Sequence, residues 1–451
     1  MRTNDRRNRG AHGVTRRDAL SLFAVAAIGG RAVAAESNTA AESNTSVESN
    51  VATGSNAVSS NPRDRSRNFR IRALTAGATI SDFADTRTIE AALAFLASAR
   101  HGFEQAGYLV ETIRVALNPL LLGASAAARR AALPRLTALD ALAAAHGAVI
   151  SIGPVFSAGD AGESLAEWSA ELARATKVLS FSGSVASAAR GVHRDAVTLA
   201  ARVISALAQA GGGGIANFRF AAAACVPPGT PFFPVAYHEG AASLSVGLET
   251  PNLVRQAFTG IEDPTAASER LRLLLNAELQ PVESLARALA EQGRYRYLGL
   301  DTSPAPARDS SIGAALEALT GEPFGSASTL QACAAVTAAV KSVDVLTCGY
   351  SGLMLPILED PVLAARVAEG RIRISDLLLY STVCGTGLDV IPVPGDVPAA
   401  ELARVIGDVA TLAVRLKKPL SARLFAVPGK KVGERVEFAD PMLCASNVMS
   451  I

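Results

Sequence analysis

Short apolar runs alternate with longer amphipathic stretches from Phe69 to the end of the chain, and this alternation limits the fold more than any other feature. It predicts strands over 69–74, 108–116, 148–152 and 178–182, separated by helices over 88–106, 129–146, 165–176 and 194–209. Alternating strands and helices are typical of α/β proteins with mostly parallel sheets. We therefore predict one α/β domain over residues 69–451, because no change of composition divides it.

The second half continues the pattern with less regularity. We expect strands over 215–224, 297–300, 343–346 and 422–427, and a strand over 377–380 that leads into residues 381–396. Helices are expected over 269–277, 281–292, 312–319, 328–340 and 398–416. The glycine run 211–214 precedes a strand instead of a helix, so a helix end is favoured over a phosphate cradle.

The N-terminus resembles a twin-arginine export signal. Arg16 and Arg17 precede a weakly apolar stretch over 21–30, and small residues follow over 32–35. We predict a signal peptide over 1–35 and an exported protein, periplasmic or extracellular, whose partners include the twin-arginine translocation machinery. The alternative is a basic tail with a chance arginine pair. Residues 36–68 repeat Glu-Ser-Asn and are predicted to form a disordered linker.

Composition excludes several classes of protein. The net charge of +2 gives no electrostatic reason to bind nucleic acid. No run reaches the roughly 18–20 apolar residues that span a membrane, so the mature form is expected to have no membrane span. The five cysteines lack a CxxC spacing, which argues against a zinc ribbon or a dithiol centre.

Four segments rich in Gly and Pro each follow a predicted strand. They cover residues 225–239, 301–311, 347–356 and 384–396. Sites in open sheets and barrels form where strand ends gather at one rim. We therefore expect these segments to meet and to carry the functional side chains.

Three residues of these segments could act as a base, a nucleophile or a ligand-binding group. His238 stands between Tyr237 and Glu239 and is the best candidate for a general base, although a structural histidine bound to a loop carbonyl fits equally well. Cys384 precedes a Gly-Thr-Gly turn and is a candidate nucleophile or pocket thiol; the favoured alternative is a small buried side chain. Cys225 has the same ambiguity and is predicted to bind ligand.

Acidic residues of the same segments are predicted to orient a substrate. Asp301 follows a strand, and an Asx turn is an equally good reading. Asp389 precedes an Ile-Pro-Val-Pro bend and has no such structural explanation. Together with Glu239 they could bind a divalent cation such as Mg²⁺ or Ca²⁺, although nothing in their spacing brings them together.

The small residues beside these carboxylates and Cys384 are expected to contact the ligand. Ser303 lies in the turn after Asp301, and Gly385 and Gly387 would let a substrate approach the backbone.

Four long motifs resemble the DUF711 family, also called UPF0210. They are FRIRALTAGATISDFADTRTIE, RFAAAACVPPGTPFFPVAYHEGAASLSVGLE, DTSPAPARDSSIGAALE and TVCGTGLDVIPVPGD. The resemblance implies a fold similar to the pyruvate formate-lyase-like glycyl radical enzymes, which is a ten-stranded α/β barrel of two parallel five-stranded halves. An open doubly wound sheet is the alternative. Radical chemistry is not expected, because the last thirty residues offer only Gly429 and Gly433, in VPGKKVGE.

These observations leave three functional hypotheses open. The first is an exported, non-radical lyase, isomerase or hydrolase acting on a small polar metabolite in a barrel-centre pocket. The second is a non-catalytic protein that binds a small ligand on the same surface. The third is an assembly component whose apolar helix faces pair with another copy as a homo-oligomer.

Overall fold

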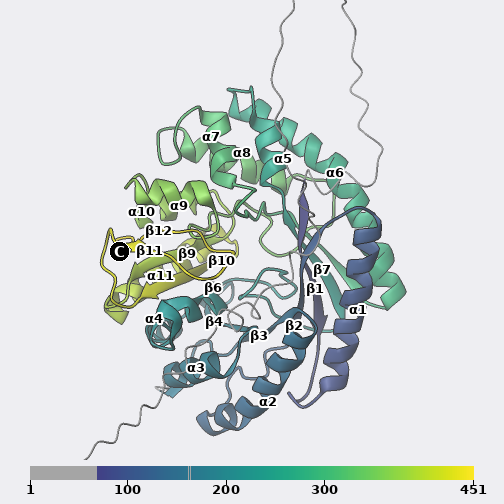
Figure 1. Cartoon of the computed structure of the whole chain (residues 1–451), viewed down its shortest axis with the longest axis vertical. Helices are drawn as coiled ribbons and strands as arrows, with labels where there is room; N and C mark the ends of the chain where they lie inside the picture. Colours follow the sequence, from purple (N-terminus) through teal and green to yellow (C-terminus); the bar gives the residue numbers. More distant parts are fainter. Residues whose placement is uncertain (1–68, 161, 163) are drawn as a thin grey trace, which may run out of the picture. The chain divides into compact units, whose positions relative to one another are not determined.

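Ten strands of the described residues build one mixed sheet, mostly parallel, with helices packed around it (Figure 1). The computed structural model describes residues 69–160, 162 and 164–451. The predicted signal peptide and linker lie outside the described residues. Within the described part, the α/β class expected from the sequence is confirmed.

The sheet has a central block of five parallel strands. On each side of this block lie two further strands that run antiparallel to it. Its hydrogen-bonded order is β8-β7-β1-β2-β3-β4-β6-β10-β9, and β5 pairs with β4. Strands β7 and β8 run parallel to each other and antiparallel to β1, and β9 and β10 stand in the same relation to β6. The strands are β1 (Arg70–Ala78), β2 (Val110–Leu117), β3 (Ala148–Pro154), β4 (Leu179–Ser187), β5 (Gly191–Val192), β6 (Phe220–Ala224), β7 (Ser243–Glu249), β8 (Arg296–Asp301), β9 (Gly387–Pro394) and β10 (Leu420–Val427), with a separate pair β11 (Arg435–Val436) and β12 (Ser446–Asn447).

Helices connect the parallel strands and cover one face of the sheet. They are α1 (Thr86–Gln105), α2 (Ala126–Ala145), α3 (Ser164–Ala175), α4 (Arg194–Ala208), α5 (Pro251–Phe258), α6 (Pro264–Gly293), α7 (Ile312–Thr320), α8 (Thr329–Lys341), α9 (Pro361–Ala368), α10 (Ile374–Tyr380) and α11 (Ala399–Leu416). In α1, Asp85 caps the first turn by accepting a hydrogen bond from the Thr88 amide, and Ile89, Leu93 and Leu96 follow at helical spacing and are buried. No helix of the described residues is long and apolar enough to cross a bilayer.

Three expectations for local structure are wrong. Residues 377–380 belong to helix α10, whose start is fixed by the Arg373 amide donating to Asp376 Oδ2 at 2.8 Å. The strand expected at 215–224 begins only at Phe220, because Gly212–Arg219 form a 3₁₀ helix. Residues 343–346 are not a strand, although Thr347 pairs with β8.

Two further differences concern proline. The helices expected at 269–277 and 281–292 are one 30-residue helix, α6, which continues through Pro281. The Ile-Pro-Val-Pro bend expected after Asp389 is instead part of strand β9. Strand β9 is the last strand in the hydrogen-bonded order of the sheet. Proline, which has no amide N–H to donate, is tolerated in such an edge strand.

The face of the sheet away from the helices, here called the inner face, is covered by irregular chain. Residues 225–242, the first inner segment, cross it: Thr75 Oγ1 donates to the Pro231 carbonyl at 3.1 Å, and Ser151 Oγ donates to the Ala236 carbonyl at 2.7 Å. A second cluster of buried residues, separate from the helix-facing core, fills this side with Ala221, Ala223, Phe232, Val235, Ala305, Tyr350 and Met354. The inner face is therefore packed with chain from the loops that were expected at the rim.

Residues 347–356, the second inner segment, pair with both end strands of the sheet. Thr347 forms a parallel bridge with Leu300 of β8, and Pro356 forms one with Asp389 of β9. The named strands form no closed barrel, yet a single ten-residue segment contacts both ends of the strand order.

Candidate functional site

Charged side chains from strands far apart in the sequence meet on the inner face. We call this set the charge network; it comprises Arg70, Arg72, Glu111, Glu249, Glu359, Asp389 and Arg423. Cross-strand register explains part of it, because Arg70 of β1 lies opposite Glu249 of β7. Most of these side chains are buried, so pairing with opposite charge is what makes their burial tolerable.

Glu359 joins the two ends of the network. Arg72 Nη2 donates to its Oε2 at 3.1 Å, and Arg423 Nη2 donates to its Oε1 at 2.6 Å. Arg423 Nε also binds Asp389 Oδ1 at 2.7 Å. The strands that carry Arg72 and Arg423 are separated by β2, β3, β4 and β6, which in a flat sheet would hold them about 24 Å apart. One carboxylate can reach both guanidinium groups only because the sheet curves around its inner face.

Glu111 and Glu249 form a carboxyl pair at the other end of the network. They share a hydrogen bond, and Arg70 Nη1 lies 3.2 Å from Glu111 and 3.1 Å from Glu249. Arg72 Nη1 binds Glu111 Oε2 at 2.7 Å and lies 3.5 Å from Glu249 Oε2. Asp309 binds the outer side of Arg70 and is largely exposed, so the pair is linked to the surface through one arginine.

The two carboxyl groups differ in protonation. Burial, with repulsion from Glu111, raises the pKa of Glu249 to about 9. Burial also acts to raise the pKa of Glu111, but Arg72 and the hydrogen bond from Glu249 outweigh it, so that pKa is lowered. We therefore expect the pair to share one proton at neutral pH, next to two guanidinium groups. This arrangement can donate and accept a proton.

Arg114 of β2 lies beside the network and, among the described residues, forms no ion pair with a carboxylate. Its Nε donates to Thr112 Oγ1 at 3.0 Å, and its guanidinium carbon lies 5.3 Å from the centre of the Phe233 ring. Burial and then repulsion from Arg72 lower the pKa of Arg114 to about 9, although Glu359 and Glu111 act in the opposite direction. Its surroundings therefore leave part of its positive charge uncompensated.

Asp301 binds backbone on the inner face. Its carboxylate accepts hydrogen bonds from the Tyr350 amide at 2.7 Å, the Ser351 amide at 2.9 Å, and the amide and hydroxyl of Ser303 at 3.1 and 2.6 Å. Burial raises the pKa of Asp301 against the effect of these donors. Ser303 in turn accepts from the Gly352 amide at 3.1 Å. Asp301 and Ser303, both predicted site residues, thus hold the second inner segment in place.

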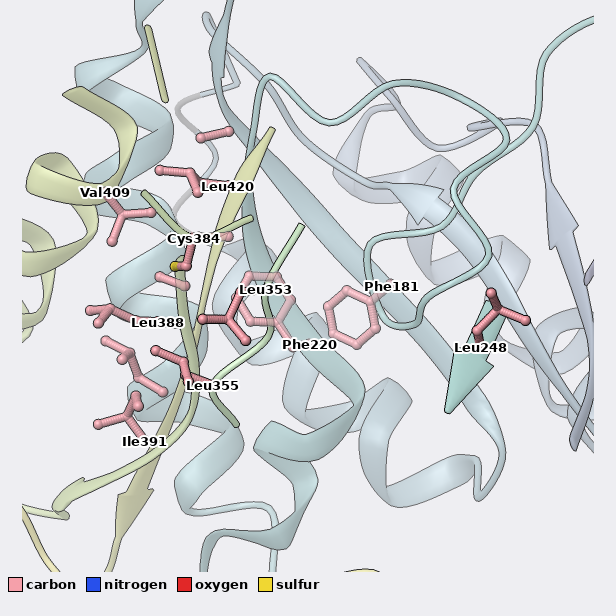
Figure 2. Close-up of a cluster of buried hydrophobic side chains, with 14 of the residues drawn as sticks. Phe181, Phe220, Leu248, Leu353, Leu355, Cys384, Leu388, Ile391, Val409 and Leu420 are labelled. Carbon is pink, nitrogen blue, oxygen red and sulfur yellow. The ribbon is translucent and has the colours of Figure 1, made fainter. Parts of the chain in front are cut away.

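Cys384 lies in the apolar core. It is 1% exposed, and Figure 2 shows it among Leu353, Leu388 and Leu420. Its position matches the small buried side chain that was the favoured alternative at this residue. Its carbonyl oxygen accepts a hydrogen bond from Lys418 Nζ, so the polar contact here is made by the backbone.

Gly385 and Gly387 have packing reasons for being glycine. A Cβ on Gly385 would lie 2.5 Å from the Cα of Gly352, in direct conflict with the second inner segment. Gly387 starts β9 with a φ of 88°, a conformation that glycine adopts without strain.

His238 is buried against the end of β1. Its Nε2 lies 3.0 Å from the Gly240 carbonyl and its Nδ1 lies 3.2 Å from Ser243 Oγ, while a Cβ on Gly77 would lie 2.2 Å from the ring. Burial lowers the pKa of His238, so the neutral ring is favoured. These contacts fit the structural histidine that the sequence left open as an alternative.

The remaining predicted residues lie in different surroundings. Glu239 is exposed and Cys225 is half-buried, with burial raising the pKa of its thiol. Asp389 is the one member of the predicted catalytic set that belongs to the charge network. His238, Cys384 and Asp301 share no hydrogen bond, because each is bound to a different segment.

The cation site imagined for Asp301, Asp389 and Glu239 does not assemble in this structure. Asp301 is occupied by amide and hydroxyl donors, Asp389 binds Arg423, and Glu239 faces solvent. In the described part of the chain, no group of three or more His, Cys, Asp or Glu side chains is arranged to hold a metal ion.

Sequence reasoning missed most of the charge network. Arg72, Glu111, Glu249 and Arg423 stand inside or at the end of strands, where alternate polar residues usually mark a solvent face. Two features of the sequence could have identified these residues. Each places a full charge in an otherwise apolar strand, and the charges on neighbouring strands have opposite sign. Glu359 has no such signal, because it lies in a turn before α9.

The sequence matches a family described as Uncharacterised ACR (DUF711) over residues 65–440. A UPF0210 protein of Pyrobaculum arsenaticum is 30% identical over 345 residues, covering 73% of this chain and 76% of the relative. A UPF0210 protein of Pyrobaculum aerophilum is 31% identical over 350 residues with the same coverage. One from Methanosarcina barkeri is 30% identical over 298 residues, covering 62% of this chain and 66% of the relative.

Proposed function

The chain belongs to the DUF711 family, also named UPF0210, and we propose that it is a non-radical enzyme that transfers a proton to or from a small polar metabolite on its inner face. The observation that carries this proposal is the Glu111–Glu249 carboxyl pair, in which Glu249 is buried and Glu111 is half-buried. Arg70 and Arg72 bind both carboxyl groups, which also share a hydrogen bond. Paired carboxyl groups with different pKa values are the usual device by which one site supplies both an acid and a base.

The roles follow from the protonation of the pair. Glu249, which carries the proton at neutral pH, would be the general acid, and ionised Glu111 would take up the proton afterwards. Arg70 and Arg72 would stabilise negative charge that develops as the proton moves. Lyase, isomerase and hydrolase reactions all need such a step, and the pair supports each of them equally.

The test is a search for turnover in a mixture of metabolites. Purified wild-type protein and the Glu249→Gln variant are incubated with a polar metabolite extract, and mass spectrometry follows every compound over time. We expect at least one metabolite to be consumed by the wild type and by a control on the exposed face of α1, Glu90→Gln, but at least tenfold more slowly by Glu249→Gln. Equal rates in all three proteins would refute the acid–base role.

The second candidate is a protein that binds a small ligand without converting it. The observation that favours it is the mutual pairing of Arg72, Glu359 and Arg423, which resembles a rigid recognition surface. A metabolite that is retained by the wild type but never consumed would decide for binding over catalysis.

We also propose that the sheet closes into a barrel through the second inner segment. Two observations support closure: the bridges of this segment to β8 and to β9, and the binding of Arg72 and Arg423 to the same carboxylate. A closed sheet would enclose the charge network inside a barrel, as the fold expected from the sequence resemblance requires.

Export by the twin-arginine pathway is a further proposal, supported by Arg16 and Arg17 and the weakly apolar stretch after them. The full chain is produced in a bacterium with this pathway, and the cell fractions are compared. We expect Arg16→Lys with Arg17→Lys to hold the protein in the cytoplasm, while Arg9→Lys leaves export unchanged. Export that is indifferent to the arginine pair would contradict the proposal.

A further inference from the structure

The buried guanidinium groups of the inner face are satisfied in different ways. Arg72 and Arg423 each bind two or more carboxylates. Arg114 is 7% exposed and has one hydrogen bond, from Nε to Thr112; among the described residues its Nη1 and Nη2 have neither a hydrogen bond nor an ion pair. A buried cation without a partner is costly, so a folded protein keeps one where something else binds it.

The nearest charges cannot serve Arg114. Arg72 and Arg423 repel it, while Glu111 and Glu359 are already engaged by Arg72 and Arg423. The Phe233 ring under the guanidinium and the Thr112 hydroxyl at Nε fix its plane and leave its outer edge free. A side-chain atom of the described residues that has no hydrogen bond and is not fully buried must be accessible to solvent. Both Nη1 and Nη2 of Arg114 meet this condition.

We propose that Arg114 binds the anionic group of the metabolite, a carboxylate or a phosphate, and so makes the inner face specific for small acids. The free edge of a guanidinium presents two parallel N–H donors, which match two oxygens of either group. This inference rests on the proposed inner-face site, because it assigns the class of substrate that the carboxyl pair would act on. It makes Arg114 a specificity residue that is separate from the proton-transfer groups.

The test uses thermal unfolding with defined anions. Succinate and phosphate are titrated into the protein at constant ionic strength set by sodium chloride, and neutral succinamide serves as the uncharged match of succinate. We expect succinate or phosphate to raise the Tm of the wild type by several degrees while succinamide does not. Which of the two anions acts distinguishes a carboxylate from a phosphate substrate. A wild type that responds to neither would overturn the inference.

Three variants locate the binding. Arg114→Met keeps the length of the side chain, removes the unpaired charge and should abolish the shift. Arg287→Met is the matched control, because Arg287 also lies over a ring, that of Tyr297 at 4.8 Å, but is half-exposed and pairs with Glu283. It should keep the full shift. Should Arg114→Met fail to fold, Arg114→Lys is used, because it keeps the charge but lacks the two parallel N–H donors of a guanidinium. The anion concentration that gives half of the full rise in Tm should then be at least tenfold higher.

The outcomes separate this inference from the proposed function. A rise in Tm with succinate or phosphate that disappears in Arg114→Met but persists in Glu249→Gln supports the inference even where no turnover is found. Turnover that depends on Glu249, in a protein whose anion shift survives Arg114→Met unchanged, would overturn the inference and leave the acid–base proposal standing.

Discussion

Glu249 gives the most direct prediction at the scale of single residues. Its pKa of about 9 in the folded protein lies above its ordinary value of 4.5, so the folded state binds more protons between these two pH values. Stability is then fully present below about pH 4.5 and is lost as the pH rises through about 9, by at most about 1.4 kcal/mol per pH unit.

We expect Glu249→Gln to flatten the fall in stability as the pH rises. His238 has a lowered pKa, so its own contribution is lost on acidification below about pH 6.5 and does not interfere above neutrality. Urea unfolding of the wild type, Glu249→Gln and the control Glu239→Gln between about pH 7 and 9 measures the difference. Identical slopes in the three proteins would show that Glu249 is ionised when folded.

Asp301 gives a second prediction. Asparagine in its place would put an NH₂ group where one of the two oxygens stands. Either the Tyr350 amide, which binds one oxygen, or the Ser303 and Ser351 donors, which bind the other, would then lose their acceptor. We expect Asp301→Asn to lower the free energy of unfolding by about 2–4 kcal/mol. Asp408→Asn, on an exposed position of α11, should change it by less than about 0.5 kcal/mol. A small effect at Asp301 would mean that the second inner segment is held by other contacts.

At the scale of elements, the second inner segment should behave as part of the sheet. The Cys348 amide donates to the Leu300 carbonyl at 3.0 Å and the Ile357 amide to the Asp389 carbonyl at 3.1 Å. Hydrogen exchange at both amides should be as slow as in the central strands, while the exposed Glu239 amide exchanges rapidly. Rapid exchange at Cys348 and Ile357 would exclude closure of the sheet through this segment.

Element types were predictable wherever local pattern and burial agree. Strand β1 and helix α1 follow from residues 69–106 because the apolar spacing changes from two to about 3.6. The prediction failed where distant contacts decide the conformation. Leu377–Tyr380 is apolar enough for a strand but lies in α10, whose first turn is capped by the Asp376 carboxylate accepting from the Arg373 amide. Pro281 predicts the end of a helix, yet α6 continues through it.

The site was less predictable than the fold for a physical reason. The predicted site residues were chosen from loops that follow strands. In this chain those loops fill the inner face, so His238, Asp301 and Cys384 take part in packing and in backbone hydrogen bonds. The charge network depends on the curvature of the sheet, which brings Arg72 and Arg423 to one carboxylate. Curvature is a property of the assembled sheet and has no local signature in either strand.

At the scale of the whole molecule, we propose both that the sheet closes around the charge network and that the protein is exported. A protein exported by the twin-arginine route crosses the membrane folded, so its inner face would be complete before it leaves the cytoplasm. Pairing with a second copy stays a prediction, which light scattering of the purified protein checks.

We expect the inner face to hold an anion at Arg114, next to the Glu111–Glu249 carboxyl pair. A crystal structure of the protein grown with selenate tests it most directly, because selenium scatters anomalously and marks the anion without ambiguity. We predict an anomalous peak within hydrogen-bond distance of Arg114 Nη1 and Nη2. Peaks only at the outer surface, with both nitrogens bound to a protein carboxylate, would show that Arg114 is no anion site.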